Sequence, residues 1–315
     1  MCSLFGLIDY SNALPAFARK TIIRILSQEC EVRGTDAAGI AYNTHGMLKI
    51  YKNPGRASKL KFTFPSDSKV IMGHTRMTTK GDQQLNQNNH PFYGNIGDRH
   101  FALAHNGVLY NDEQLRTELH LPETDIQTDS YIAVQLLEKY KKVDFESLGH
   151  MSEQVQGSFC FSVLTDENEL YLVRGSNPLA IYDCGGYYIY ASTSDILDSA
   201  LKRLHIKMKK KIKISSGDIL KITIDGTIER GNFNYRDHDY MGYGFLNSYD
   251  DYYDTGEWEI VIEYAEYFGF KREDIIMLYD MGYEARDVEE LLYDPTMLQT
   301  VIEEYRNLMA CEYER

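Results

Sequence analysis

Short apolar runs of the kind that form β-strands follow one another along the first three quarters of this sequence, where helical patterns are mostly gathered at the front and in the middle. We predict strands at residues 4–9, 38–42, 47–51, 69–75, 101–108, 159–165, 169–174, 187–191 and 218–223. Apolar residues at helical spacing predict helices at 16–30, 113–119, 129–140, 145–155 and 195–204. Because strands and helices do not alternate strictly, the pattern favours antiparallel sheets with helices packed outside over a doubly wound parallel sheet.

Turn residues divide these elements. Asn43-Thr44-His45-Gly46 and Asp225-Gly226 are typical hairpin turns. A stretch rich in Gly, Asn and Gln, from Thr78 to Gly97, predicts a long loop. Long loops inside compact domains are often functional, so this loop is a candidate part of a binding site.

Acidic charge is concentrated in the last quarter of the chain. Residues 237–315 carry 21 Asp and Glu against 5 Lys and Arg, whereas residues 1–236 carry 26 against 28. This shift predicts a boundary near Arg236, between a domain at 1–236 and an acidic linker with a helical tail at 237–315. Because nucleic acids and anionic membranes repel an acidic surface, we expect neither as a partner.

Location and metal binding can also be predicted from composition. No stretch has the apolar length that a membrane span needs, and the first ten residues do not resemble a secretory signal. The five cysteines are scattered and form no Cys-x-x-Cys pair, which argues against disulfides and a zinc site. We therefore expect a cytoplasmic protein without metal, and core positions for Cys30, Cys160 and Cys184. The basic run 207–213 is expected to be a solvated turn before a strand.

The tail is predicted to be helical, at residues 257–268, 273–281, 284–292 and 296–309. The sequence from Asp280 to Glu284, followed by Val288, Leu291 and Leu292, loosely resembles a ubiquitin-associated three-helix module. The alternative is plain packing of these helices against the first domain. Twelve tyrosines and strong acidity favour an interaction surface, so the tail is a candidate for binding a protein partner.

Cys2 has a position that permits a particular chemistry. A small second residue allows Met1 to be removed, which would leave Cys2 with a free α-amine. The ordinary pKa of such an amine is about 8 and that of a thiol about 8.5, so the amine can take the thiol proton. One residue would then supply both nucleophile and base. Taken alone, however, a Cys at this position favours the simpler interpretation of a small buried residue.

Five motifs accompany Cys2 in a fixed order. They are Arg33-Gly34-Thr35-Asp36-Ala37-Ala38-Gly39, Gly73-His74-Thr75-Arg76-Met77-Thr78-Thr79-Lys80-Gly81, Asn89-His90-Pro91-Phe92, Ala104-His105-Asn106-Gly107 and Gln127-Thr128-Asp129-Ser130. Over residues 2–230 the chain resembles the class II, N-terminal-nucleophile glutamine amidotransferases, most of all the glutaminase domain of glucosamine-6-phosphate synthase. The resemblance implies an α+β fold, a four-layer αββα sandwich, followed here by a small all-helical acidic region.

The resemblance also implies a reaction and a set of roles. Cys2 would attack the side-chain amide of glutamine and form a thioester, with Asn106 and Gly107 as the oxyanion hole. Arg76 would bind the α-carboxylate of glutamine and Asp129 its α-ammonium group. Ammonia would pass to a separate synthase subunit, and no cofactor is implied.

Further positions are assigned by the same resemblance. Thr79 would line the glutamine pocket, and Arg33 and His105 would support the site. The loop at 78–97 would order over bound glutamine as a lid. His74, His90 and His105 lie inside the motifs without metal-ligand spacing, so we interpret them as structural.

Three positions depart from the family pattern, and several alternatives stay open. Ser3 replaces the usual Gly, Met77 the usual Trp and Lys80 the usual His. Asp129 could instead cap the helix predicted at 129–140. The chain could also be another N-terminal-nucleophile amidohydrolase acting on a γ-glutamyl amide, or a catalytically inactive binding or regulatory protein that uses its acidic tail.

Overall fold

The computed structural model describes residues 2–235, 256–292 and 295–313. The chain divides into two compact units, residues 1–241 and 242–315. The predicted boundary at Arg236 falls in the segment 236–255, outside the described residues. Each unit is therefore taken by itself.

The first sheet has seven strands in the order β11-β9-β10-β1-β4-β2-β3, all paired antiparallel. Their bounds are β1 Ser3–Ile8, β2 Ala37–Thr44, β3 Met47–Pro54, β4 Val70–Arg76, β9 Ala180–Asp183, β10 Tyr188–Ala191 and β11 Lys210–Ile212. The central strands β1 and β4 are buried along their whole length, as their continuous apolar runs predict. The tight β2–β3 turn forms as expected, with positive φ at His45 and Gly46.

The second sheet has six antiparallel strands in the order β13-β12-β8-β7-β6-β5. Their bounds are β5 Phe92–Ile96, β6 Arg99–Leu109, β7 Gly157–Thr165, β8 Leu170–Arg174, β12 Asp218–Ile222 and β13 Ile228–Asn232. The longest strand, β6, carries the Asn106-Gly107 motif near its end.

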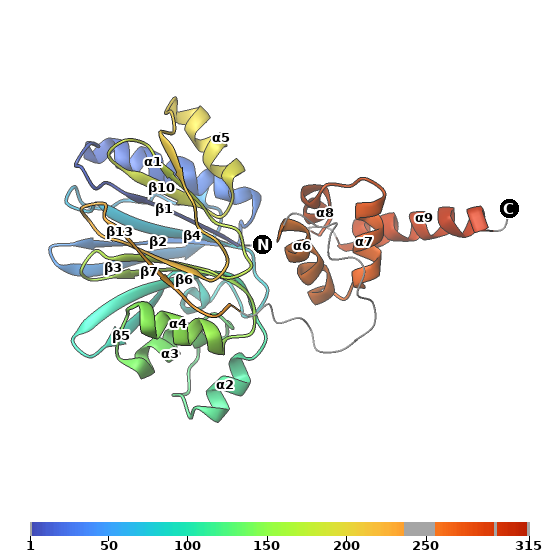
Figure 1. Ribbon diagram of the computed structural model, residues 1–315, viewed down its shortest axis with the longest axis horizontal. Helices are drawn as coiled ribbons and strands as arrows, with labels where there is room; N and C mark the ends of the chain where they lie inside the picture. Colours follow the sequence, from blue (N-terminus) through green and yellow to red (C-terminus); the bar gives the residue numbers. More distant parts are fainter. Residues whose placement is uncertain (1, 236–255, 293–294, 314–315) are drawn as a thin grey trace. The chain divides into compact units, whose positions relative to one another are not determined.

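Helices cover the outer faces of both sheets (Figure 1). Helices α1 (Ala16–Glu29) and α5 (Ser194–Leu204) pack on the first sheet, where Leu26 and Leu197 join one buried cluster. Helices α3 (Tyr131–Tyr140) and α4 (Phe145–Gln154) pack on the second sheet through residues such as Leu136 and Met151, and α2 (Asp112–Glu118) lies beside α3. The predicted αββα sandwich is confirmed.

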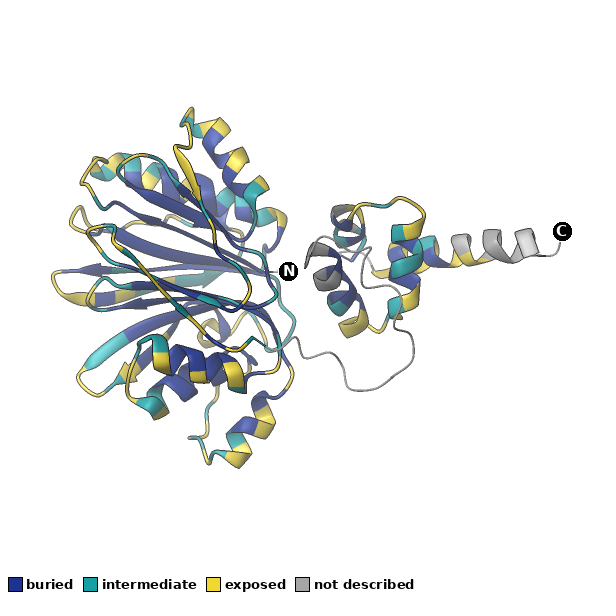
Figure 2. Ribbon diagram, in the orientation of Figure 1, coloured by how far each residue is buried: buried dark blue, intermediate teal, exposed yellow. Residues whose placement is uncertain are grey.

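Three buried clusters fill the spaces between the layers. The cluster between the two sheets joins Leu4 and Met72 of the first sheet to Ala104 and Leu172 of the second. Burial follows the central strands through the middle of the sandwich, and exposed residues lie on the outer faces of the helices, in the turns and on the edge strands (Figure 2). Each fully buried Leu or Ile contributes about 1.5–3 kcal/mol relative to an exposed one, so this internal layer holds the sheets face to face.

Several elements differ from the sequence-based expectation. The segment 78–97 is not one continuous loop, because β5 forms within it where Phe92 pairs with Leu103 and enters the core. The basic run at 207–213 contains β11, an exposed edge strand where lysines discourage further pairing. Strand β9 was not predicted, and α3 begins at Tyr131 rather than at residue 129.

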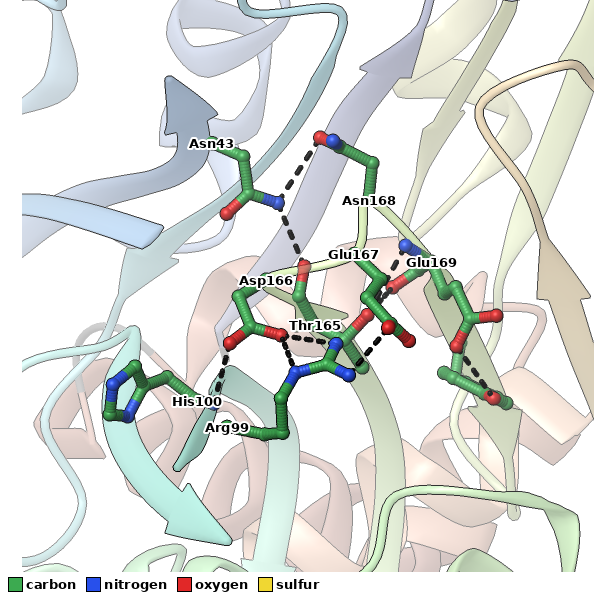
Figure 3. A network of polar contacts seen from close by, with 9 residues as sticks. Asn43, Arg99, His100, Thr165, Asp166, Glu167, Asn168 and Glu169 are labelled. Carbon is green, nitrogen blue, oxygen red and sulfur yellow. Dashed lines mark hydrogen bonds and ion pairs between the residues drawn. The ribbon is translucent and has the colours of Figure 1, made fainter. Parts of the chain in front are cut away.

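At the sheet ends where β2 stops and β6 starts, a polar network joins the two sheets (Figure 3). Asn43 Nδ2 donates to the carbonyl oxygen of Thr165 at 2.8 Å and to Asn168 Oδ1 at 3.1 Å. Arg99 binds Asp166 through Nε at 2.8 Å and NH2 at 2.6 Å. The turn after β7 is therefore fastened both to its own sheet and to the opposite one.

The described residues of the second unit form helices, as predicted. They are α6 Gly256–Tyr267, α7 Arg272–Asp280, α8 Ala285–Leu291 and α9 Pro295–Tyr313. Trp258 packs edge-to-face on Tyr279 at 5.0 Å between ring centroids, and Arg306 Nε donates to Asp274 Oδ1 at 3.0 Å, which ties α9 to α7.

Across the described residues, no helix is long and apolar enough to cross a membrane.

Candidate active site

The residues singled out by the sequence motifs gather at the ends of strands from both sheets. Ser3 pairs with Thr75 in the β1–β4 register, so Cys2 lies beside Arg76 at the end of β4. Arg33 Nε donates to the carbonyl oxygen of Cys2 at 3.1 Å, which fixes the backbone just before β1. The Cys2 thiol itself donates to the carbonyl oxygen of Met77 at 3.4 Å.

The Cys2 thiol is buried, with 7% of the residue exposed. Burial raises the pKa of the thiol, and the hydrogen bond to Met77 and the nearby charge of Arg76 offset this only in part. The thiol is therefore protonated near neutral pH and needs a base to act as a nucleophile. Within the described part of the chain, neither a histidine nor a carboxylate is hydrogen-bonded to its sulfur.

Arg76 is held by three oxygen atoms from the segment that follows it. Its NH1 group donates to Asn89 Oδ1 at 2.8 Å, and NH2 donates to the carbonyl oxygens of Lys80 at 2.6 Å and Gly81 at 3.1 Å. A guanidinium group has five N–H donors, so two remain for a further anion. Burial lowers the pKa of Arg76, but a guanidinium group keeps its charge under all ordinary conditions.

The Asn106-Gly107 pair has an unusual environment at the end of β6. Asn106 is fully buried, and its side-chain amide has no hydrogen-bond partner in the regions that the structure describes. Its carbonyl oxygen accepts a hydrogen bond from Asn177 Nδ2 at 2.7 Å. Gly107 has a φ of +145°, and a Cβ atom there would lie 2.0 Å from the carbonyl oxygen of Ser158, so only glycine fits.

His105 and His74 link the sheets at this point. His74 Nε2 contacts the carbonyl oxygen of His105 at 2.9 Å, which joins β4 to β6. His105 Nδ1 lies 2.8 Å from Ser130 Oγ. Burial lowers the pKa of both rings to about 3, so both are neutral and serve as structural contacts. The His90 ring packs against the His74 ring in a tilted arrangement, with 4.2 Å between centroids. No group of His, Cys, Asp or Glu that could hold a metal occurs in the described residues.

Asp129 is a buried carboxylate just before α3. Its Oδ2 atom accepts a hydrogen bond from the backbone N–H of Leu109 at 2.7 Å, across to the end of β6. Burial raises the pKa of Asp129 to about 6. Ser130, not Asp129, occupies the N-cap position of α3. The negative charge of Asp129 and the positive charge of Arg76 both act on the Cys2 thiol, so the three groups lie within electrostatic range of one another.

Some contacts at the site have no counterpart among the predicted roles. Asp36 Oδ2 accepts from the backbone N–H of Thr78 at 2.7 Å, and Lys80 forms an ion pair with Asp112. Asn89 and Asp36 stand inside the quoted motifs, so the motifs marked them without indicating their contacts. Asn177 lies in no motif, and nothing in the sequence indicated it. Thr79, which is predicted to line the glutamine pocket, is half-buried in the segment between β4 and β5.

Comparison with known proteins gives one consistent family. Residues 74–199 match the family described as a glutamine amidotransferase domain. Glutamine–fructose-6-phosphate aminotransferase (isomerizing) of Staphylococcus aureus strain Mu50 is 29% identical over 248 residues, which cover 74% of this chain and 39% of the relative. The counterpart from Staphylococcus epidermidis strain ATCC 35984 is 29% identical over 201 residues, 61% of this chain and 32% of that protein. This chain thus spans about two fifths or less of the length of these relatives.

Solved structures share the fold. Glutamine phosphoribosylpyrophosphate amidotransferase from B. subtilis aligns with a TM-score of 0.59 at 21% identity, over 75% of this chain and 50% of that one. The allosteric regulatory enzyme of purine biosynthesis aligns with the same TM-score at 22% identity, over 75% of this chain and 50% of that one. The solved structures, at 21% and 22% identity, show the shared fold, and the sequence comparisons lead to one conclusion: this chain carries a glutamine amidotransferase domain homologous to that of the glutamine–fructose-6-phosphate aminotransferases.

Proposed function

We propose that this chain hydrolyses the side-chain amide of free glutamine, with Cys2 as the nucleophile, and releases glutamate and ammonia. The observation that carries the proposal is the placement of the buried Cys2 thiol beside Arg76 and within range of Asp129. A cation and an anion within electrostatic range of a nucleophile match the two charged α-groups of an amino acid.

The chemical step follows from the state of the thiol. Because burial keeps the Cys2 thiol protonated, the proposal includes removal of Met1, so that the α-amine of Cys2 takes the thiol proton. The sulfur then attacks the side-chain carbonyl carbon of glutamine. The amine returns the proton to the leaving nitrogen, ammonia departs and a γ-glutamyl thioester remains. Water hydrolyses this thioester to glutamate and restores the thiol.

The oxyanion of each tetrahedral intermediate is assigned to Asn106 and Gly107. The side-chain amide of Asn106 is buried and unpartnered among the described residues, so it can donate to an oxyanion without breaking another hydrogen bond. A preorganised donor of this kind contributes about 3–4 kcal/mol to stabilising the transition state. The obligatory glycine at 107 lets the backbone approach closely.

Recognition of free glutamine is assigned to Arg76, Asp129 and Thr79. Arg76 keeps two N–H donors for the α-carboxylate, and Asp129 is ionised above about pH 6, so it can bind the α-ammonium group. Replacement of either residue should raise KM for glutamine far more than for an amide that lacks the α-groups. Unchanged selectivity would favour a different amidohydrolase activity.

The proposal extends to the fate of ammonia. Two relatives are named as transferring glutamine nitrogen to fructose 6-phosphate, and they are much longer than this chain. We assign the acceptor reaction to a separate synthase subunit in the cytoplasm. The acidic helical unit, with Tyr267 and Met281 exposed, is the proposed contact surface for a protein partner. Loss of co-purification with that subunit on deletion of residues 237–315 would support this assignment, and unchanged co-purification would contradict it.

The test of the nucleophile is the intact mass of the full chain before and after treatment with a reactive diazo-ketone analogue of glutamine. Loss of Met1 and gain of one adduct are expected, with protection by excess glutamine and no adduct on Cys2→Ala. The Cys2→Ala variant should also lose glutamine hydrolysis while keeping its circular dichroism spectrum. Retained Met1 without an adduct would contradict the proposal and favour a catalytically inactive binding protein.

A further inference from the structure

Lys80 forms an ion pair that joins the segment after β4 to helix α2. Its Nζ atom lies 3.1 Å from Asp112 Oδ1 and 3.0 Å from Oδ2, and 3.5 Å from Glu113 Oε1. The Asp112 side chain is only 6% exposed, whereas that of Lys80 is 40% exposed. The pair is thus half-buried, with its carboxylate well inside the protein.

Asp112 is fixed to the body of the sandwich. It is the first residue of α2, and Arg116 in the next turn of that helix lies 4.0 Å from it. Arg116 Nε in turn donates to Gln135 Oε1 of α3 at 3.2 Å. The carboxylate that binds Lys80 is therefore linked through Arg116 to α3, in the helical layer of the second sheet.

The backbone of Lys80 contacts the proposed glutamine site directly. Its carbonyl oxygen accepts a hydrogen bond from Arg76 NH2 at 2.6 Å, and the next carbonyl oxygen, at Gly81, accepts from the same nitrogen at 3.1 Å. Two of the three acceptors that orient the Arg76 guanidinium group thus come from the residues that the Lys80–Asp112 pair anchors. Movement of this segment would change the direction of the remaining two donors of Arg76.

We propose that Lys80 is a positioning residue for glutamine binding: its ion pair with Asp112 holds the backbone oxygens that orient Arg76 toward the α-carboxylate. The inference rests on the proposed function. It also gives a role to Lys80, one of the positions where the chain departs from its family. Two other contacts hold the same segment, because the side chain of Gln127 accepts from Asp82 N at 3.1 Å and Asn88 Nδ2 at 2.9 Å. Loss of the pair should therefore weaken binding without unfolding the domain.

The test measures glutamine affinity by titration calorimetry in full chains that carry Cys2→Ala, so that binding is read without turnover. The Lys80→Met substitution should raise Kd about tenfold, which corresponds to about 1.4 kcal/mol. Asp112→Asn should have a similar effect, and the double variant should bind no worse than either single one, because both changes remove the same pair. Lys80→Arg keeps the positive charge, so its Kd for glutamine should stay within about threefold of the parent value.

A matched control comes from an exposed ion pair elsewhere. Lys142 binds Asp144 at 2.8 Å and Glu146 at 2.9 Å on the surface near α4, and Lys142→Met should leave Kd unchanged. Equal affinity of the parent and Lys80→Met, or effects of Lys80→Met and Asp112→Asn that multiply in the double variant, would overturn the inference alone. Absence of glutamine binding in the parent would overturn both the inference and the proposed function. Binding in the parent without hydrolysis by the Cys2 form would contradict the proposed reaction and leave the inference standing.

Discussion

Replacement of Asp129 by Asn should make the protein more stable while it weakens glutamine binding. Asp129 is buried, and burial raises the pKa of its carboxyl group from 3.8 to about 6. A change of one unit in pKa corresponds to about 1.4 kcal/mol, so the raised pKa of Asp129 corresponds to roughly 3 kcal/mol of folding free energy that is lost when the carboxyl group ionises. A group kept in the fold at such a cost is typical of a functional site.

The sign of the pH dependence follows from the raised pKa. The stability that protonated Asp129 contributes is fully present below its ordinary pKa of 3.8 and is lost as the pH rises through about 6. Asn cannot ionise, and its side-chain oxygen can still accept the hydrogen bond from Leu109 N. At pH 7.5 the variant should therefore be more stable by about 1–3 kcal/mol, and the gain should shrink toward zero between pH 6 and pH 4.

Thermal unfolding of both full chains, followed by circular dichroism at several pH values, measures this gain. For a domain of this size each kcal/mol raises the melting temperature by about 2–4 °C. Asp9→Asn is the control, because Asp9 is a buried carboxylate paired with Arg19 at 2.7 Å, and its replacement should lower stability. A variant at Asp129 that is less stable than the parent at pH 7.5, or a gain that does not change with pH, would refute the reasoning.

Three further predictions concern other parts of the first unit. Gly107→Ala places a Cβ 2.0 Å from a carbonyl oxygen and should abolish hydrolysis and lower the melting temperature, whereas Gly97→Ala, in open space at φ +73°, should cost only about 1 kcal/mol and keep activity. Asn43→Leu removes the side-chain link between the sheets (Figure 3) and should lower stability by about 1–3 kcal/mol in chemical denaturation, with kcat/KM unchanged because the link lies at the opposite strand ends. Truncation after Arg236 should leave a folded unit that still hydrolyses glutamine, and aggregation of that product would show that the acidic region completes the first core.

Elements with strong patterns of their own could be predicted from the sequence. The strands β1, β4, β6 and β7 contain runs of apolar residues because both of their faces are largely buried, and α5 has a polar face and an apolar face. The strands β5, β9 and β11 could not be predicted in this way. Each has five residues or fewer, which is too short for a clear alternation. β5 and β9 pair with the next strand along the chain, whereas β11 pairs with β9 beyond an intervening strand and helix, so its pairing depends on the tertiary structure.

The site could be predicted in part for a similar reason. The motifs that contain Arg76 and Asn106 end predicted strands, so their meeting at the sheet ends is a consequence of the fold. The partners of these residues depend on the tertiary structure. Asn177, which contacts Asn106, lies 71 positions away from it in the sequence, and Asp112 lies 32 positions away from Lys80. No local sequence pattern specifies contacts between residues so far apart along the chain. The N-cap alternative for Asp129 was wrong in detail, because α3 begins one residue later than that interpretation requires.

The three departures from the family pattern do not bear equally on catalysis. Side chains of successive residues in a strand point to opposite faces, and Ser3 Oγ contacts Cys30 Sγ at 3.3 Å, so the added hydroxyl group lies on the face away from the Cys2 side chain. At Met77 it is the carbonyl oxygen that contacts the Cys2 thiol, and a backbone atom is supplied by any residue type. Lys80 adds a side-chain contact to Asp112, at a residue whose backbone holds Arg76. We therefore expect the change at Lys80 to affect how tightly glutamine binds, and the other two changes to leave the steps proposed at the Cys2 sulfur unaltered.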